Sequence, residues 1–454
     1  MSHPTKLEPE VERGEERLPR RLGVWSAAAV LVGSTIGSGI FRVPSAVAAE
    51  AGSVGAALLV WVAGAVVALF GALTLAELAT LFPRSGGIYV FLREAYGPLP
   101  AFLFGWTELL VIRPAALGAI AMIFAQYLGA FFPLSDGGVR VIAAVAIAVL
   151  AAANIRSIVW GAAVQNVSTL AKVVALAGLA LVAFVFGSGQ GGGALAEPWS
   201  FEPRSWGGLG VALVAALWAY DGWADLTFVA GEVRDPERVL PRALLWGVGV
   251  VILVYLAVNL AYLYVLPLEG VAGSRLVAAD AATQIFGRAG ATVIAGLVVL
   301  STFGALNGST MTGPRILYAM ADDGLFFRVI AAVHPRYGTP YAAIGLAALL
   351  GIAYVSIRTF EQLAGAFILG IWPFYALAVG AVFVLRRRRP ELVRPYRAVG
   401  YPVVPVIFLL ASVAMLVNAL IEEPVEAGLS LGVIVAGIPV YYAWRALGRR
   451  AREA

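Results

Sequence analysis

The chain has 454 residues, of which 61% are hydrophobic and 13% are charged, and its mean hydropathy is +0.87. Soluble domains are typically about 45–50% apolar and about 25% charged, so this composition excludes an ordinary water-soluble fold and indicates a membrane protein. With no cysteine and only two histidines, His3 and His334, the sequence predicts no disulfide, no metal site and no cofactor.

Residues 1–21 carry many charges and lack the apolar core of a signal peptide, so we expect a cytosolic N-terminal tail. From residue 22 onward, apolar segments long enough to cross about 30 Å of hydrocarbon follow one another closely. They predict an all-α membrane protein with twelve transmembrane helices, followed by a short cytosolic tail, 448–454. The expected limits of the helices are Leu22–Ala49, Val54–Leu81, Leu99–Phe132, Val139–Ala153, Trp160–Phe186, Trp206–Gly231, Ala243–Leu266, Thr283–Thr312, Tyr341–Ile357, Phe360–Leu385, Val403–Ile421 and Gly428–Leu447.

The Lys and Arg residues are distributed unevenly between the two sets of loops. If the N-terminus is placed inside, the inner loops together with the two tails hold 24 of the 32, including the run Arg386–Arg389. Loops on the cytoplasmic side of membrane proteins are enriched in Lys and Arg, so we expect both termini to be cytoplasmic in the cell (inner) membrane. This distribution also explains the net charge of +5 without any binding of nucleic acid. The outer segments hold only Arg140, Arg204, Arg275, Arg288 and Arg358.

Two of the predicted spans are interrupted by glycine near their middle. The first span contains Gly33–Gly39, GSTIGSG, and the sixth contains Trp218–Trp223, WAYDGW. Each glycine in a helix interior costs about 1 kcal/mol relative to alanine, so three within seven residues make the first stretch easy to unwind. Interrupted helices at matching positions of two halves are typical of transporter binding sites. Alternatively, Gly33 and Gly37 could form a small-residue face for helix packing.

Unwound backbone at the depth of the bilayer has to line a cavity, because its peptide groups cannot be left facing lipid. A helix that restarts near Ser38–Ile40 would direct its free N–H groups and positive dipole end into that cavity, which suits a carboxylate. Carbonyl groups freed by the two breaks suit an ammonium group. The sequence therefore predicts a site for a zwitterion such as an amino acid.

Lys172 lies in the middle of the fifth span, and the only other lysine is Lys6. A charge near the bilayer centre costs about 2.5–3.5 kcal/mol, so it normally faces a partner or water. The compact ammonium group could replace a bound monovalent cation or exchange a proton; alternatively, the side chain could extend to the membrane interface. Glu77 is expected at the inner interface and Arg42 in the outer vestibule.

Asp221 has three possible roles at the second break: it could bind a substrate cation, pair with a neighbour or cap a half-helix. Glu108 and Arg113 on the third span are interpreted as an ion pair within the bundle and not as substrate ligands. Three aromatic residues surround the second break, and one of them could close over a ligand, although all three could simply pack in the core. They are Trp218, Tyr220 and Trp223.

From about Leu22 to the last span, the sequence resembles the amino-acid permeases of the amino acid–polyamine–organocation (APC) superfamily. It is most similar to the L-type amino-acid transporter (LAT) branch, in a prokaryote-type form. Several motifs in the order typical of that family carry the resemblance. They are Val32–Phe41, Pro83–Tyr89, Trp106–Pro114, Trp218–Trp223 with Gly231–Val233, and Leu300–Ser309.

This resemblance implies a LeuT-like fold, in which five helices and the next five form an inverted repeat and helices 1 and 6 are discontinuous. The transporter domain would cover 22–447. Repeat one would cover about 22–186, repeat two about 206–385, and two extra helices about 403–447.

The resemblance also implies the residues of the site. Trp218 would act as a gate over the substrate, and Lys172 would stand where sodium-coupled relatives bind an ion, close to a hydroxyl of span eight. Transport would then be sodium-independent. The α-carboxylate and α-amine would be bound by Thr35, Gly37, Ser38, Gly39, Trp218, Ala219 and Asp221.

The implied function is secondary transport of L-amino acids by alternating access, with exchange favoured and proton-coupled symport through Lys172 as the alternative. A membrane enzyme would need a nucleophile–base pair or a metal cluster, and a channel would need a charged ring or a repeated filter; the sequence has neither. Animal members of the LAT branch join a heavy chain through a cysteine, so no disulfide-linked partner is expected for this chain. The preferred side chain stays open between small neutral, larger neutral and cationic amino acids.

Overall fold

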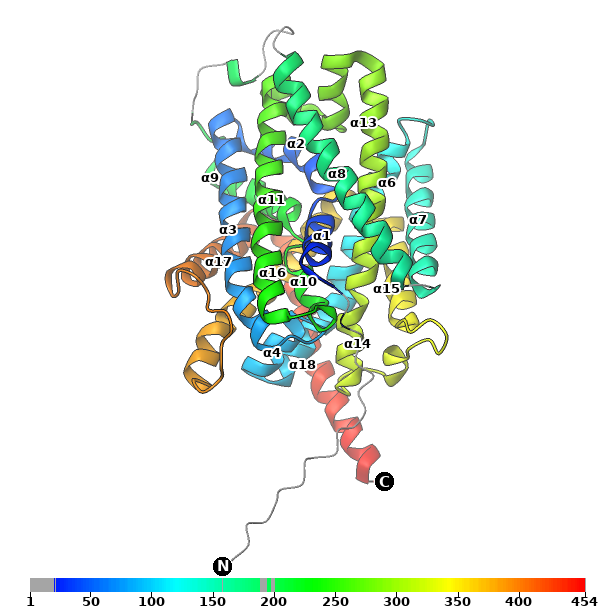
Figure 1. Cartoon of the computed structure of the whole chain (residues 1–454), viewed down its shortest axis with the longest axis vertical. Helices are drawn as coiled ribbons and strands as arrows, with labels where there is room; N and C mark the ends of the chain where they lie inside the picture. The colour runs from blue at the N-terminus through cyan, green and yellow to red at the C-terminus, as the bar shows by residue number, and fades with distance from the viewer. Residues whose placement is uncertain (1–19, 21, 157, 188–193, 197–200, 454) are drawn as a thin grey trace, which may run out of the picture.

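The protein is a bundle of helices, most of which run along its long axis (Figure 1). The structure, a computed structural model, describes residues 20, 22–156, 158–187, 194–196 and 201–453, with backbone alone for 158–167, 196 and 447–453. Apart from Arg20, the predicted tail 1–21 lies outside the described residues. Within the described part, the only β feature is an isolated bridge between Leu22 and Val233.

The chain forms long helices joined in places by short helical turns. In order, they are α1 (Val24–Thr35), α2 (Gly39–Ala51), α3 (Val54–Leu81), α4 (Ile88–Tyr96), α5 (Pro98–Thr107), the π-helical turn η1 (Glu108–Ile112), α6 (Arg113–Leu128), α7 (Asp136–Arg156), α8 (Ile158–Phe186), η3 (Ala194–Ala196), α9 (Trp206–Tyr220), α10 (Asp225–Phe228), η4 (Ala230–Glu232), α11 (Pro236–Val265), α12 (Leu268–Gly273), α13 (Val277–Thr312), α14 (Pro314–Asp322), η5 (Arg328–Ala331), α15 (Tyr341–Ile357), α16 (Phe360–Arg388), α17 (Val403–Glu422) and α18 (Pro424–Glu453).

Many of these helices are suited to a bilayer by their length and composition. Within the described residues, nine helices are long and apolar enough to cross a membrane, or ten if α1 and α2 count as one bent span. The other two predicted spans correspond to α9 and α15, which are apolar but shorter. Large apolar side chains such as Val141, Val145 and Val149 of α7 point outward and are more than half exposed, as expected for a surface that contacts lipid.

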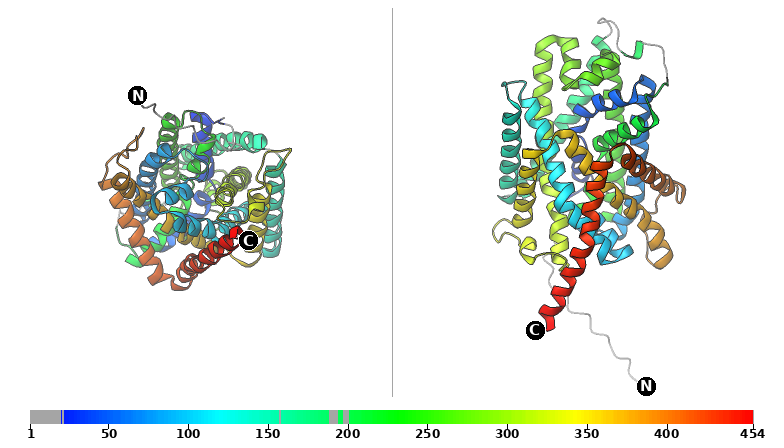
Figure 2. Two further views of the ribbon diagram at one scale, coloured as in Figure 1. Left: turned by 90° about the horizontal axis from the view of Figure 1, so that it is seen from below. Right: turned by 180° about the vertical axis from the view of Figure 1, so that it is seen from behind.

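The third predicted span, formed by α5, η1 and α6, occupies the centre of the bundle. In its most apolar stretch 89% of the residues are buried, compared with 22% in α18. Small residues such as Ala115, Ala119 and Gly118 on α6 let neighbouring helices approach closely. The helices α17 and α18 pack on the outside of the bundle, and α18 extends past its lower end (Figure 2).

Helices five predicted spans apart lie side by side. The broken span α1–α2 contacts the broken span α9–α10, and α3 packs against α11. In the same way, α6 packs against α13 and α7 against α15. Each of the first four predicted spans therefore has the span five positions later as a neighbour.

Several helix boundaries differ from the sequence prediction; the seventh span, for example, was expected to begin at Ala243, but α11 begins at Pro236. The eighth span was expected to begin at Thr283, but α13 begins at Val277 and continues through a bend at Gly287, whose φ of 62° a glycine adopts without strain. The predicted tail 448–454 begins inside a helix, since α18 continues to Glu453. The good helix formers Arg, Ala and Glu at that end favour this continuation.

Candidate functional site

The first predicted break is present in the structure. The helix α1 ends at Thr35, α2 begins at Gly39, and the two axes are bent by 43°. Between them, the N–H of Gly37 donates to the carbonyl of Thr35 at 2.8 Å. The amides of Ser38 and Gly39 at the start of α2 have no carbonyl one turn earlier within the helix, so they are available to a ligand, whereas the N–H of Phe41 donates to the carbonyl of Ser38 at 3.3 Å.

The second predicted break is also present. The helix α9 ends at Tyr220 and α10 begins at Asp225, which leaves 221–224 outside any helix. Gly222 has a φ of 110°, in the region that favours glycine. A Cβ at this position would lie 2.7 Å from the amide nitrogen of Thr35, so the second break touches the first at a point where only glycine fits.

The backbones of α2 and α9 also meet directly. A Cβ built on Gly39 would lie 2.4 Å from the Cα of Ala219, which is closer than any ordinary contact. This contact brings the N-terminal end of α2 and the C-terminal end of α9 into the same region of the bundle. The two helix ends carry partial charges of opposite sign, positive for α2 and negative for α9.

A cavity of about 530 Å³, including some space open to solvent, lies beside the two breaks. Six of the predicted substrate-binding residues line it, but Ala219 does not, because its backbone packs against Gly39. Lys172 is also absent from the cavity wall. The lining residues are Ser34, Thr35, Gly37, Ser38, Gly39, Arg113, Ala116, Ile120, Trp218, Asp221, Gly222, Asp225, Ala305, Ser309, Phe367 and Ile371.

Of the three aromatic residues at the second break, Trp218 lines the cavity. Its ring meets Phe360 and Phe367 of α16 edge-to-face, with centroid distances of 6.2 and 5.0 Å. The rings of Tyr220 and Trp223 pack elsewhere in the core. Trp218 is therefore the aromatic side chain positioned between the cavity and the start of α16.

Lys172 lies behind the first break, on the helix α8. Its side chain is buried, and Nζ donates to the carbonyls of Gly33 and Ile36 at 2.8 and 2.7 Å. These carbonyls lie at the C-terminal end of α1, where the helix dipole favours a positive charge. The alternative of a side chain extending to the interface is therefore excluded. Ser301 of α13 shares a smaller cavity with Lys172.

Asp221 is paired within the protein. Its carboxylate accepts a hydrogen bond from the hydroxyl of Tyr375 on α16 at 2.6 Å, and its N–H donates to the carbonyl of Trp218. Pairing with a neighbour, one of its three predicted roles, is therefore present. Because Asp221 also lines the cavity, this pairing does not keep it from a ligand.

Glu108 and Arg113 form the predicted ion pair, with Nη2 and Oε1 2.6 Å apart and both side chains buried. Their positions follow from a π-helical turn that precedes Pro114. Proline has no N–H, so the carbonyl of Leu110 loses its helical partner, and the hydroxyl of Tyr354 donates to it instead. Such turns are frequent at functional sites.

Ten of the sixteen lining residues were not assigned to the site from the sequence, among them Arg113, Asp225 and Phe367. Arg113 donates to the hydroxyl of Ser309 at 2.7 Å, and Asp225 accepts from Thr312 at 3.0 Å. Asp225 could have been found, because an ionisable residue in a predicted span usually has a function. Phe367 gives no local signal, since only the packing of α16 against α9 brings it to the cavity.

Comparisons with known proteins agree with this geometry. The family model described as "Amino acid permease" matches residues 22–443. The serine/threonine exchanger SteT of Bacillus subtilis (strain 168) is 34% identical over 428 residues, which cover 94% of this chain and 97% of SteT. The human b(0,+)-type amino acid transporter 1 is 35% identical over 419 residues, covering 90% and 84% of the two chains.

A third relative is the human large neutral amino acids transporter small subunit 2, which is 34% identical over 444 residues. These residues cover 94% of this chain and 81% of the relative. The relatives are named as transporters and exchangers, so the resemblance to the APC superfamily and its LAT-type members is confirmed, as is the expectation that the protein is not an enzyme. The chain is a multi-pass membrane protein that belongs to the amino acid permease family.

Proposed function

We propose that this chain is a sodium-independent secondary transporter that exchanges L-amino acids across the membrane by alternating access. The observation that carries the proposal is the meeting of two broken helices, with ends of opposite polarity, at one cavity. The free amides at Ser38 and Gly39 suit an α-carboxylate. The C-terminal end of α9 and Asp221 suit an α-ammonium group.

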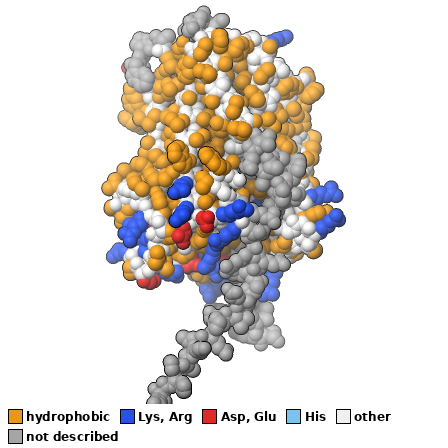
Figure 3. All heavy atoms as spheres, in the orientation of Figure 1, with side chains coloured by type: hydrophobic (Ala, Val, Ile, Leu, Met, Phe, Trp, Pro, Cys, Tyr) orange, Lys and Arg blue, Asp and Glu red, His pale blue; other side chains and the backbone are white. Residues whose placement is uncertain are grey.

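We propose the complete fold to be twelve spans, with the first ten in a five-plus-five inverted repeat. The packing of each of the first four predicted spans against the span five positions later supports this arrangement. Both termini are proposed to be cytoplasmic. The blue Lys and Arg side chains visible in Figure 3 gather at the lower end, where Figure 1 places the end of α18, and this distribution supports the orientation.

Alternating access needs contacts that can open on either side of the cavity. Toward the proposed outer side, Trp218 lies against the start of α16, where Glu361 pairs with Arg42 of α2 at 2.6 Å. This position of Arg42 fits the expected outer vestibule. The ring of Trp218 and the ion pair between Arg42 and Glu361 would together form the outer gate. Of the two, Trp218 would lie next to the substrate.

Toward the proposed inner side, α4, η4 and α14 are linked by polar contacts. Arg315 pairs with Glu232 at 2.7 Å. Burial and the nearby Asp323 carboxylate raise the pKa of Tyr89, so its hydroxyl stays protonated and donates to Asp323 at 2.7 Å. Arg93 pairs with the same carboxylate. Opening toward the cytoplasm would break these contacts.

The position of Lys172 supports independence from sodium. Its ammonium group already occupies the space next to the carbonyls of Gly33 and Ile36, where a monovalent cation would otherwise bind. Proton-coupled symport is the second candidate, because a buried lysine can also transfer a proton. Exchange and symport differ in whether an empty vesicle accumulates substrate.

We propose small hydroxyl amino acids as substrates. The hydroxyls of Ser34 and Ser309 and the guanidinium of Arg113 line the cavity beside small residues such as Ala116 and Ala305. The relative named as a serine/threonine exchanger supports this choice. Because the chain has no cysteine, we also propose that it works without a disulfide-linked heavy chain.

The test is uptake of labelled L-serine into proteoliposomes containing the purified protein. Uptake should be fast when L-serine or L-threonine is trapped inside, slow into empty vesicles, and equal in sodium and potassium buffers. Equal uptake into loaded and empty vesicles would exclude obligate exchange. In that case, stimulation by an inward proton gradient would establish symport. Absence of saturable amino-acid uptake under every condition would refute the proposed function.

A further inference from the structure

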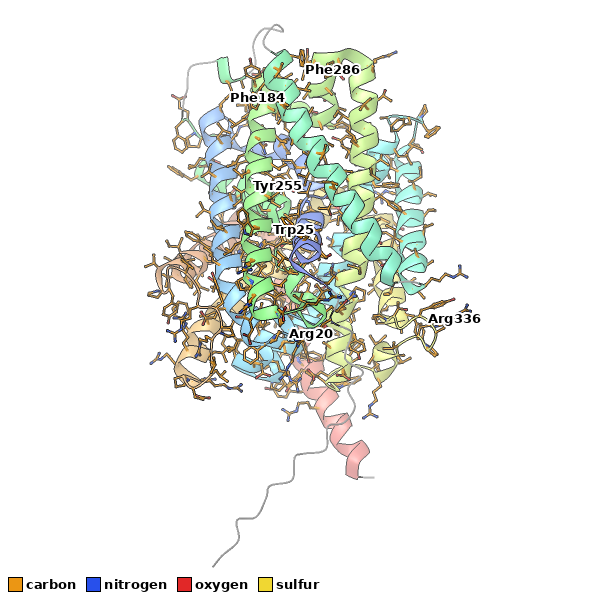
Figure 4. All side chains as sticks on the ribbon, viewed as in Figure 1. Arg20, Trp25, Phe184, Tyr255, Phe286 and Arg336 are labelled. Atoms are coloured by element: carbon orange, nitrogen blue, oxygen red, sulfur yellow. The ribbon has the colours of Figure 1, made fainter. Side chains whose placement is uncertain are left out.

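The lower end of α18 contacts the turn that follows α14. Trp444 of α18 donates from its indole N–H to the carbonyl of Gly324 at 3.0 Å. Its ring also meets the next two aromatic residues of that segment. It stacks on Phe326 with the centroids 6.4 Å apart and lies edge-to-face with Phe327 at 4.8 Å. Figure 4 shows Arg336, in the loop after η5, in the lower half of the molecule, where α18 also ends.

The contacted turn carries Asp323, whose carboxylate is part of the polar contacts on the proposed inner side. Gly324 follows Asp323 directly, and its φ of 71° lets the chain reverse at the end of α14. The N–H of Gly324 donates to the carbonyl of Ala321, and the N–H of Leu325 donates to that of Met320, both at 3.0 Å. These two bonds form a Schellman motif, which fixes the turn to the end of α14. A displacement of the Gly324 carbonyl therefore displaces Asp323 as well.

The helix α18 is itself fixed on α5, which belongs to the central third span. The indole of Trp106 on α5 donates to the carbonyl of Val433 at 3.0 Å. The rings of Phe102 on α5 and Tyr441 on α18 lie 5.3 Å apart. Trp444 comes about one helical turn after Tyr441. The end of α18 therefore connects the turn after α14 to the centre of the bundle.

Asp323 is thus held from two directions. The helix α4 supplies the hydroxyl of Tyr89 at 2.7 Å and the guanidinium of Arg93. The helix α18 supplies Trp444, which acts through the carbonyl of Gly324. Both α4 and α18 pack on α5. A movement that separates the turn from α4 while α4, α5 and α18 stay together therefore also separates it from Trp444.

We propose that Trp444 is a positioning residue of the inner gate. It holds the turn after α14 where Asp323 meets Tyr89 and Arg93, and it thereby stabilises the state that is closed toward the cytoplasm. Loss of its contacts shifts the population toward the state that is open on that side. This inference rests on the proposed alternating access.

The test uses the absence of cysteine from the chain. The substitution Ala116→Cys introduces a single thiol in the wall of the cavity, and no other thiol is present. Its rate of reaction with a membrane-impermeant methanethiosulfonate reagent reports how often the cavity is open to the side that receives the reagent. The rate is measured from the cytoplasmic side in inside-out vesicles and from the outer side in right-side-out vesicles, without substrate.

Three variants are compared in this single-thiol chain. Trp444→Ala removes the hydrogen bond and both ring contacts, whereas Trp444→Phe keeps a ring and removes only the N–H. Trp246→Ala is the matched control, because Trp246 on α11 is 71% exposed and makes no ring contact or hydrogen bond within the described part of the chain.

We expect Trp444→Ala to raise the rate of labelling from the cytoplasmic side about three- to tenfold, because one hydrogen bond and two aromatic contacts are lost. Labelling from the outer side should become slower, because a cavity that is open inward more often is open outward less often. Trp444→Phe should give a smaller change in the same directions, and Trp246→Ala should match the parent.

An unchanged rate from the cytoplasmic side in Trp444→Ala overturns the inference. A rise of equal size from both sides also overturns it, because the substitution would then only loosen the fold. If Trp444→Ala yields no folded protein, Trp444→Phe decides, and cytoplasmic labelling equal to that of the parent overturns the inference.

A double substitution tests whether Trp444 acts through Asp323. Asp323→Asn weakens the contacts with α4 and should itself raise labelling from the cytoplasmic side. Adding Trp444→Ala to it should then raise the rate by a smaller factor than Trp444→Ala does alone, because residues in one network are not additive. An equal factor in both backgrounds would refute this route.

The labelling needs no transport, so the two proposals fail separately. If the wild type exchanges no amino acid in proteoliposomes, the proposed function fails. If it exchanges serine and the labelling of Trp444→Ala equals that of the parent, only the role of Trp444 is refuted.

Discussion

The contact between Gly39 and Ala219 gives a sharp prediction for Gly39→Ala. The added methyl group would lie 2.4 Å from the Cα of Ala219 and 2.7 Å from its Cβ, whereas ordinary contacts begin at 3.4 Å. The backbones of α2 and α9 would therefore have to separate by roughly 1 Å, because the Cα of Ala219 cannot rotate away as a flexible side chain could.

Overpacking of this kind typically costs about 1–3 kcal/mol, and the rigid backbone contact places Gly39→Ala near the upper value. A loss of about 3 kcal/mol in substrate binding corresponds to an affinity about two orders of magnitude lower. We therefore expect serine exchange by Gly39→Ala to fall about 100-fold or more at substrate concentrations below KM.

The assay is exchange in proteoliposomes, normalised to the amount of reconstituted protein, together with thermal unfolding in detergent. Gly178→Ala is the matched control, because nothing lies within 4 Å of a Cβ at that position on α8. It should transport normally and melt at the wild-type temperature or slightly higher, since alanine favours the helix. Normal exchange by Gly39→Ala would refute the direct contact between the two broken helices.

Three further substitutions test other parts of the account. Lys172→Ala leaves two buried carbonyls of the first break without their donor, at a cost of about 1–3 kcal/mol each. The rate of serine exchange should therefore fall at least about tenfold, and an unchanged rate would exclude a role for Lys172 in transport. Glu361→Gln weakens the partly exposed ion pair with Arg42, which is worth about 0.2–1 kcal/mol. Initial exchange rates should therefore change less than about fivefold and become less sensitive to salt. A total loss of exchange would contradict the proposed outer gate. Glu108→Ala leaves the guanidinium of Arg113 buried without its carboxylate, so the free energy of unfolding should drop by about 3–5 kcal/mol. A melting temperature equal to that of the wild type would contradict this last expectation.

The two breaks could be predicted from the sequence because their cause is local. Glycines at 33, 37 and 39 weaken the first helix wherever it is placed, and Gly222 adopts a backbone angle that other residues rarely adopt. The position of Lys172 in a span likewise showed that it needs a partner. Which carbonyls it binds depends on how α8 crosses α1, and no sequence pattern specifies that crossing.

Glu77 shows why other features could not be predicted. It was expected at the membrane interface, but it is buried and accepts hydrogen bonds from Arg386 at 3.0 and 2.6 Å and from the N–H of Ala398 at 2.7 Å. The segment after α16 folds back over the end of α3 and covers the carboxylate. Phe367 reaches the site by similar long-range packing, so only the structure reveals it.

The central claim is that peptide groups of two broken helices bind both charged ends of an amino acid. Competition against the uptake of labelled L-serine tests it most directly, with unlabelled L-serine, its methyl ester and the analogue that has a hydroxyl in place of the α-amine. The account predicts that L-serine competes strongly and that both analogues compete at least about 100-fold more weakly, because each lacks one charged end. Competition by either analogue as strong as that by L-serine would contradict the claim.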